Sequence, residues 1–305
     1  MQQVPKPVRL RRRSPQQRDQ AWTALLCLFP ALVIFGLFNI YPAIWSGWLS
    51  LLNWDGLSAV KTFVGFSNYR ALFADPEFWN SLRVTALYTV GVTVFGLAAG
   101  LLVAVALNRR VVGRTFYRAA YFTPVVTATV AAGVVWALLF DPVNGMVNLG
   151  LRQLGLEGPR WLGDPAWALP SVMVVGVWKR LGFNMAVYLA GLQAIPPEYY
   201  EAAEVDGASS LQRFWHITWP LLTPTTVLLT IMSVIDSFQA FDHVFVMTSG
   251  GPLGATDVLP LYLYRQGFRL YHLGYASAVG WVIFAVVFLA TLLQWRLSGE
   301  GGWRR

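Results

Sequence analysis

Long apolar runs constrain the fold of this chain more than any other feature of its sequence. A helix needs about 20 predominantly apolar residues to cross the hydrocarbon core of a bilayer, and runs of that length recur along the chain. Charged residues make up only 12% of the sequence, about half of their usual share in a soluble domain. A large soluble helical protein, the alternative, would use shorter helices with one polar face. The sequence therefore predicts an all-α, polytopic membrane protein.

The basic residues indicate how the predicted helices are oriented. We place six transmembrane helices near residues 20–41, 84–107, 119–140, 167–191, 221–242 and 274–296. Most Lys and Arg residues then fall in the segments 1–19, 108–118, 192–220 and 297–305. The positive-inside rule assigns such segments to the cytoplasm, so both termini are predicted to be cytoplasmic. The predicted domains are a basic segment, residues 1–19, and a membrane domain, residues 20–305. Because the charges flank membrane spans, membrane lipid is an expected partner and nucleic acid is not.

The chain offers no catalytic or cofactor-binding motif of its own. A single cysteine, Cys27, excludes an internal disulfide, and His216, His243 and His272 lack metal-ligand spacing. No G-x-x-x-x-G-K-S/T phosphate loop is present. We therefore predict that the chain is not an enzyme, that it binds no metal or cofactor, and that any energy from ATP reaches it through a partner.

A charged segment, residues 198–220, interrupts the apolar sequence between the fourth and fifth predicted spans. Proline at 196 and 197 ends the fourth span, and acidic residues then begin a helix-forming stretch. Gly207 breaks that stretch, and Ser209 or Ser210 is a plausible N-cap for a second helix. We predict two short helices bent at Gly207. Their mixture of aromatic and charged residues suits docking to a partner protein, or, alternatively, a hairpin lying on lipid headgroups.

Polar residues within spans are costly and mark functional or paired positions. In the fourth span these are Lys179 and Arg180, and in the fifth they are Ser233, Asp236, Ser237, Gln239 and Asp242. One face of the fifth span carries Ser233, Ser237 and Ala240 by i, i+4, i+7 spacing. Two interpretations stay open: Lys179 or Arg180 pairs with Asp236 to hold two helices together, or these side chains contact substrate.

The charged segment also carries a recognisable motif. Glu201-Ala202-Ala203, three residues, Gly207, nine residues, and then Ile217-x-Trp219-Pro220 resemble the EAA loop of ABC importer permeases. Trp219 stands where that family has leucine. Residues 63–73, 189–209 and 241–252 resemble the carbohydrate-uptake branch of the family, which includes the maltose, multiple-sugar and glycerol-3-phosphate permeases.

The resemblance implies a type I ABC importer permease fold and a half-transporter in a bacterial or archaeal plasma membrane. It implies a second permease subunit, two ATP-binding subunits that hold ATP and Mg²⁺, and an extracytoplasmic substrate-binding protein that delivers a sugar. The ATPase-coupling residues would be Glu201, Ala202, Ala203, Gly207, Ile217 and Pro220. An ion-gradient-driven secondary transporter that works alone is the alternative, and it would need no ATPase-docking loop.

The same resemblance implies a sugar site between the fourth and fifth spans. The positions that match its lining are Trp178, Leu181, Gly182, Ser233, Ser237 and Ala240, and they are less polar here than in the maltose permease. Together with the polar span residues Lys179, Asp236 and Gln239, they make up the predicted substrate pathway.

Overall fold

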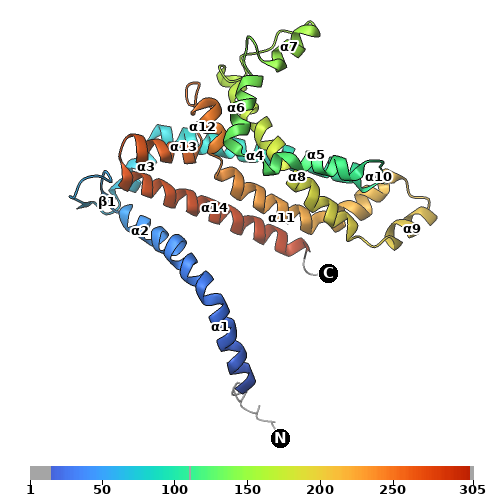
Figure 1. Cartoon of the computed structure of the whole chain (residues 1–305), viewed down its shortest axis with the longest axis horizontal. Coiled ribbons are helices and arrows are strands. Elements are labelled where there is room, and N and C mark those ends of the chain that lie inside the picture. The colour runs from blue at the N-terminus through green and yellow to red at the C-terminus, as the bar shows by residue number, and fades with distance from the viewer. Residues whose placement is uncertain (1–14, 110, 303–305) are drawn as a thin grey trace.

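The computed structural model describes residues 15–109 and 111–302, and most of them are helical. Figure 1 shows a bundle of long helices, with α1 extending from it on one side and the α6–α7 segment projecting on another. The elements are α1 (Pro15–Phe35), η1 (Gly36–Ile40), α2 (Tyr41–Leu49), β1 (Leu52–Asn53), β2 (Thr62–Phe63), α3 (Ser67–Ala74), α4 (Pro76–Asn108), α5 (Arg114–Val126), α6 (Thr129–Leu139), α7 (Met146–Gln153), α8 (Pro165–Gln193), α9 (Glu198–Val205), α10 (Ser210–Arg213), η2 (Phe214–Thr218), α11 (Trp219–Phe238), α12 (Asp242–Thr248), α13 (Leu259–Tyr264), η3 (Arg265–Arg269) and α14 (Leu273–Gly302). The two strands pair antiparallel, with Leu52 opposite Phe63.

Five described helices are long and apolar enough to cross a membrane, and a bent pair of helices would make a sixth span. The five are Leu26–Leu49, Pro76–Asn108, Pro165–Gln193, Ser210–Phe238 and Leu273–Arg296. They correspond to the first, second, fourth, fifth and sixth predicted spans. The prediction of an all-α, polytopic membrane protein is therefore confirmed.

The third predicted span, 119–140, is wrong as a single helix. α5 and α6 are bent by 101°, because Thr127 and Ala128 between them adopt extended backbone. Pro124 in the last turn of α5 also lacks a backbone N–H to donate. A carbonyl freed by such a break needs a partner inside a membrane, and the Thr127 carbonyl accepts a 2.7 Å hydrogen bond from Nζ of Lys179. A lysine of α8 thus stabilises the break.

The fifth span starts and ends earlier than the predicted 221–242. Helix runs without interruption from Ser210 to Phe238. A π-helical turn, η2, precedes Pro220, so the helix passes through this proline instead of starting after it. The chain leaves the helix after Phe238, and Asp242 begins the separate helix α12. Asp242 therefore does not share a helix with Asp236, contrary to the prediction.

α4 and α8 form the centre of the bundle and pack along each other. Small residues of α4 face α8 at the crossing, where a Cβ added to Gly100 would lie 2.5 Å from the Cβ of Asn184. Next to this crossing, Ala104, Met185 and Leu189 belong to one buried apolar cluster. Glycine at this position allows the two helices to approach closely enough to bury that cluster.

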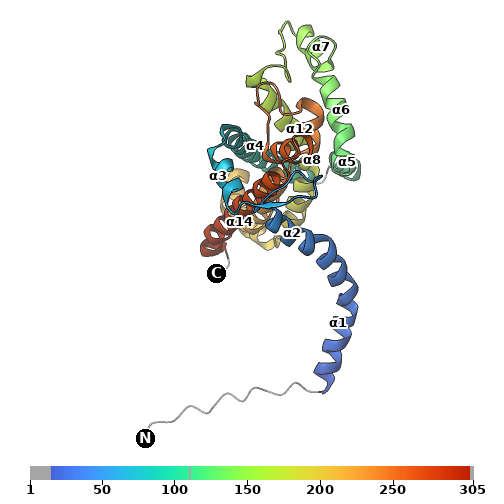
Figure 2. The same cartoon turned by 90° about the vertical axis from the view of Figure 1, so that its left-hand side faces the viewer.

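The first span stands apart from the bundle along α1, whereas its second part, α2, contacts α14. Its apolar stretch is not buried against the rest of the chain, and Figures 1 and 2 both show α1 extending away from the other helices. α1 already begins at Pro15, so the described end of the predicted basic segment 1–19 is helical. Residues 1–14 of that segment lie outside the described residues.

Candidate functional site

The segment from 198 to 220, here called the elbow, joins α8 to the fifth span. α9 begins after Pro197 with Glu198 and Glu201 in its first turn, where negative charge favours the helix dipole. The bend follows at Gly207, whose φ of 75° lies in the left-handed region that glycine tolerates best. Nothing lies within 4 Å of the position that a Cβ on Gly207 would take, so the backbone angle alone favours glycine. The predicted bend at Gly207 is confirmed.

Two local interactions brace the elbow beyond its bend. The Ser209 hydroxyl accepts a hydrogen bond from the backbone N–H of Gln212, and the Gln212 side chain accepts one from the backbone N–H of Ser209 at 2.8 Å. This capping box confirms Ser209 as the N-cap. An ion pair of 3.2 Å between Arg213 and Glu204 ties the second half of the elbow back to α9. The prediction of a second, separate short helix is wrong. The second half of the elbow forms the first turns of the fifth span.

The elbow presents its side chains outward from the described chain. No residue of α9 is buried, and the apolar side chains of Val205 and Trp215 are 89% and 54% exposed. Among the predicted coupling residues, Glu201, Ala202, Gly207 and Pro220 are exposed, whereas Ala203 and Ile217 are half-buried. A braced surface that mixes apolar and charged side chains can contact another protein.

A second candidate site is a cavity of about 260 Å³ within the bundle. It is lined by Tyr88, Val92, Thr129, Gly176, Lys179, Arg180, Asp236, Ser237, Gln239, Ala240, Phe241, Asp242 and His243. These residues come from α4, α6, α8, α11 and α12 and the connection between the last two. We call this cavity the bundle pocket. It brings together five of the predicted pathway residues, namely Lys179, Asp236, Ser237, Gln239 and Ala240.

An ion pair crosses the bundle pocket. The guanidinium of Arg180 on α8 pairs with the Asp236 carboxylate on α11, so Arg180, and not Lys179, is the partner of Asp236. The Arg180 side chain is 15% exposed and that of Asp236 is 55% exposed. Nε and Nη2 of Arg180 are buried without a partner among the described residues, which leaves them able to donate hydrogen bonds.

Four predicted pathway residues do not line the bundle pocket. Trp178 packs edge-on against Trp136 of α6, with ring centroids 5.7 Å apart. A side chain on Gly182 would collide with the backbone of α5 at Tyr121, so this glycine allows close helix packing. The other two are Leu181, which is half-buried, and Ser233, which is fully buried. Their assignment to the substrate pathway stays a prediction.

Sequence reasoning missed a pair that lines the bundle pocket. The Tyr88 hydroxyl and His243 Nε2 lie 2.8 Å apart in a hydrogen bond, although 155 residues separate them. Gly176 has no room for a side chain because the Tyr88 hydroxyl occupies that space. The sequence offered one signal for Tyr88, because it is a polar residue in the apolar second span and shares a helix face with Val92.

Several buried polar side chains near the pocket have no hydrogen-bond partner among the described residues. They are Thr89 and Thr93 of α4, Asn184 of α8, and Ser233 and Ser237 of α11. Buried polar groups are usually paired. Of these five residues only Ser237 lines the bundle pocket.

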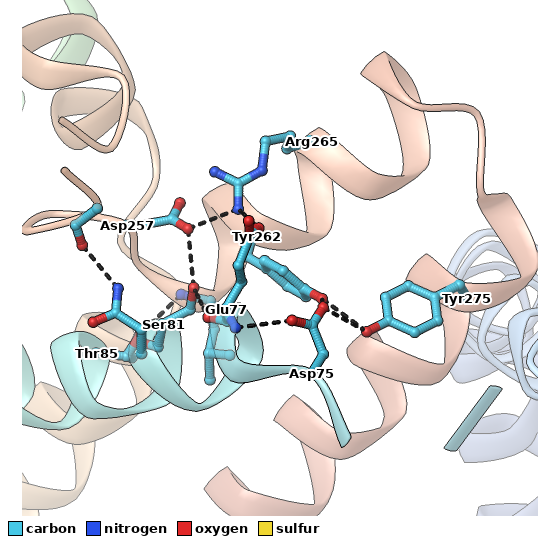
Figure 3. Close-up of polar contacts among 11 residues, drawn as sticks. Asp75, Glu77, Ser81, Thr85, Asp257, Tyr262, Arg265 and Tyr275 are labelled. Carbon is cyan, nitrogen blue, oxygen red and sulfur yellow. Dashed lines mark hydrogen bonds and ion pairs between the residues drawn. The ribbon is translucent and has the colours of Figure 1, made fainter. Parts of the chain in front are cut away.

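A polar network fixes the other end of the bundle, shown in Figure 3. Asp257 accepts hydrogen bonds from Ser81 at 3.0 Å and from Arg265 at 2.9 Å, and Arg265 also pairs with Glu77 at 2.9 Å. Burial raises the pKa of Asp257 above its ordinary value, although Arg265 opposes the shift. These contacts hold the start of α4 against η3 and the loop before α13.

Asp75, the N-cap of α4, belongs to the same end of the bundle. Its carboxylate accepts hydrogen bonds from the hydroxyls of Tyr262 at 2.5 Å and Tyr275 at 3.2 Å, as Figure 3 shows. Burial alone would raise the pKa of Asp75, but the hydrogen bonds from Tyr262, the backbone of Glu77 and Tyr275 together lower it.

Within the described ranges, no group of three or more His, Cys, Asp or Glu residues could hold a metal ion.

Comparison with known proteins identifies the class to which this arrangement belongs. Residues 96–298 match the family of binding-protein-dependent transport system inner membrane components. The probable ABC transporter permease protein YurN of Bacillus subtilis is 35% identical over 280 residues, which cover 90% of this chain and 96% of the relative. The sulfoquinovosyl glycerol transport system permease protein SmoG of Agrobacterium fabrum is 36% identical over 277 residues, covering 90% and 89%.

The fold has a close counterpart among solved structures. A bacterial ABC transporter involved in import of the acidic polysaccharide alginate contains a chain that superposes with a TM-score of 0.81 at 24% identity, covering 93% of this chain and 98% of that one. A second structure of a bacterial alginate transporter includes a periplasmic protein bound to an alginate pentasaccharide and gives the same TM-score.

The chain belongs to the family of inner-membrane permease components of binding-protein-dependent ABC transport systems. It is a multi-pass inner membrane protein and a transporter subunit, not an enzyme. Membership in this family sets aside a secondary transporter that works alone, and it is consistent with the EAA motif in the elbow.

Proposed function

We propose that this permease subunit forms half of the path for a sugar or sugar derivative, and that a second, related permease subunit forms the other half. Named relatives such as SmoG carry sugar derivatives, and the bundle pocket combines an unpaired serine hydroxyl with polar and aromatic side chains. Such groups suit ligands with many hydroxyls. An extracytoplasmic binding protein delivers the substrate.

The elbow is the contact for one of the two ATP-binding subunits. The observation that carries this proposal is that α9 buries no residue and is nevertheless held in one bent geometry by Gly207, the Ser209 capping box and the Arg213–Glu204 ion pair. In this account Glu201, Ala202, Ala203, Gly207, Ile217 and Pro220 couple motion of the ATPase to the bundle. Alanines allow close approach, and Glu201 provides a charge for a basic partner.

Reconstitution tests this function directly. Proteoliposomes that contain this chain, its partner permease and the ATP-binding subunits should take up sugar only with ATP inside and binding protein outside. Uptake by this chain alone under an ion gradient would contradict the proposal. An assembly that imports without binding protein would also contradict it.

The bundle pocket is tested with a matched pair of conservative variants. Ser237→Ala removes an unpaired hydroxyl that lines the pocket, and Thr93→Val removes an unpaired hydroxyl that does not. Neither variant breaks a hydrogen bond in the described chain, so both should fold with unchanged or slightly higher stability. We expect slower sugar uptake for Ser237→Ala alone. Equal uptake by the two variants would show that Ser237 does not contact substrate.

A further inference from the structure

A second cavity, here called the basic groove, lies between α5 and α8 and belongs to neither site described above. Its volume is about 470 Å³. It is lined by Thr115, Arg118, Ala119, Phe122, Met185, Ala186, Leu189, Ala190 and Gln193. The groove lies near the elbow: Figure 1 shows α5 beside α8 and reaching toward α10, and Gln193 is the last residue of α8 before the elbow.

Most of the groove wall is apolar. α5 contributes Ala119 and Phe122, and α8 contributes Met185, Ala186 and Leu189. Phe122 is 37% exposed, so part of its ring is open to whatever fills the groove. An apolar wall of this kind binds a hydrocarbon chain favourably but has no favourable interaction with a small, fully hydrated anion.

At the mouth of the groove, the guanidiniums of Arg114 and Arg118 both point to the neutral side-chain amide of Gln193. The amide oxygen of Gln193, in the orientation that suits its neighbours, accepts hydrogen bonds from Nη2 of Arg114 at 2.8 Å and from Nη2 of Arg118 at 3.1 Å. Each guanidinium also keeps a buried Nε without a partner. Among the described residues, neither arginine forms an ion pair with a carboxylate.

Two guanidiniums that share one amide oxygen leave their like charges uncompensated. An anion at this mouth would relieve the repulsion and receive charge-assisted hydrogen bonds, and arginine pairs suit the oxygens of a phosphate. α5 itself begins at Arg114, and no side chain caps its N-terminus. Free backbone N–H groups there add to the positive potential.

We propose that the basic groove binds an anionic phospholipid, with the headgroup phosphate on Arg114 and Arg118 and an acyl chain along Phe122, Met185 and Leu189. Basic pockets between transmembrane helices at the cytoplasmic face suit anionic headgroups in this way. The lipid joins α5 to the end of α8 directly before the elbow. It therefore stiffens the part of the bundle that receives force from the elbow.

Lipid retention measures the occupancy of the groove. The full-length chain, co-expressed with its partner subunits, is purified in mild detergent from membranes that contain phosphatidylglycerol, and bound lipid is quantified by mass spectrometry. We expect phosphatidylglycerol to be enriched over phosphatidylethanolamine in the wild type. Arg114→Gln/Arg118→Gln should weaken phosphatidylglycerol binding by about thirtyfold, since each basic residue contributes about 1 kcal/mol to binding anionic lipid.

Two further variants separate the groove from a general effect of charge. Arg70→Gln/Arg83→Gln removes the same charge from exposed side chains outside the groove and should retain the wild-type amount of lipid. Ala190→Trp fills the groove without changing its charge and should lose lipid as the double arginine variant does. Sugar uptake is not measured, so the result is independent of the function proposed above.

Three outcomes would overturn the inference. Bound phosphatidylglycerol could be unchanged in both groove variants. It could fall equally in Arg70→Gln/Arg83→Gln, which would indicate a non-specific charge effect. Finally, a cysteine at position 190 could cross-link to the partner permease, which would show that protein, and not lipid, fills the groove.

Discussion

At the scale of single residues, the ion pair between Arg180 and Asp236 joins two walls of the bundle pocket. Both side chains line the pocket, and the Asp236 carboxylate is the more exposed of the two, at 55% against 15% for Arg180. A charge in a membrane helix costs about 2.5–3.5 kcal/mol on insertion scales. Removing one partner leaves the other uncompensated.

A double-mutant cycle tests whether this ion pair is structural. Asp236→Asn and Arg180→Gln should each lower the melting temperature of the purified complex and reduce sugar uptake. The double variant should recover most of the lost melting temperature, because neither charge remains unpaired. Additive losses would show that the pair contributes nothing to stability. Recovered stability without recovered uptake would assign one of the two groups to substrate contact.

The carboxyl groups of Asp257 and Asp75, at the other end of the bundle, should make folding stability depend on pH in opposite directions. The raised pKa of Asp257 means that the folded chain holds this proton more tightly than the unfolded chain, so its contribution to stability is lost as pH rises above 3.8 and through the folded pKa. The lowered pKa of Asp75 has the reverse effect, with stability present above 3.8 and lost as pH falls below it.

Melting temperatures of the wild type, Asp257→Asn and Asp75→Asn between pH 3 and pH 7 check these signs. As pH rises, Asp257→Asn should gain melting temperature relative to the wild type, since it removes a carboxyl whose ionisation is opposed by burial. The melting temperature of Asp75→Asn should fall relative to that of the wild type over the same rise in pH. Parallel curves for all three proteins would contradict the assignment.

At the scale of elements, signals that are local in sequence predicted structure well. The proline pair before α9, the glycine at 207 and the serine N-cap at 209 each act within a few residues, and the start of α9, the bend and the N-cap form as they indicate. The apolar runs likewise located five spans, since about twenty apolar residues leave a helix few alternatives in a membrane.

Features that depend on distant contacts could not be predicted in this way. The break between α5 and α6 is stabilised by Lys179, which lies 52 residues from the carbonyl it bonds. The pairing of Tyr88 with His243 spans 155 residues. Gly182, which the family resemblance places in the substrate pathway, also leaves room for the backbone of α5. Only the packed structure distinguishes these roles.

The bend of the elbow provides an element-scale prediction. Gly207→Ala forces alanine into a left-handed conformation, which costs about 1–2 kcal/mol, and should lower substrate-stimulated ATPase activity of the assembled transporter. Gly150→Ala is the matched control: Gly150 also has open space around it but lies within α7 without a positive φ. This change should leave activity intact and slightly favour the helix. Equal activity in both variants would show that the bend is not needed.

At the scale of the whole molecule, α8 and the fifth span connect the two candidate sites. α8 contributes Lys179 and Arg180 to the bundle pocket and ends at Gln193, directly before the elbow. The fifth span contributes Asp236 and Ser237 to the same pocket and begins inside the elbow. A displacement of the elbow therefore moves both walls of the pocket together. Under the function proposed above, this continuity couples ATP hydrolysis to transport.

The most direct test of this coupling measures retention of the ATP-binding subunits and sugar import in one preparation. In Glu201→Lys/Gly207→Val, we expect the partner permease to co-purify normally, the ATP-binding subunits to be lost, and import to cease. Glu157→Lys reverses an exposed charge outside the elbow. This variant should retain the partner permease, the ATP-binding subunits and sugar import. Retention of the ATP-binding subunits and full import by the elbow variant would contradict the account.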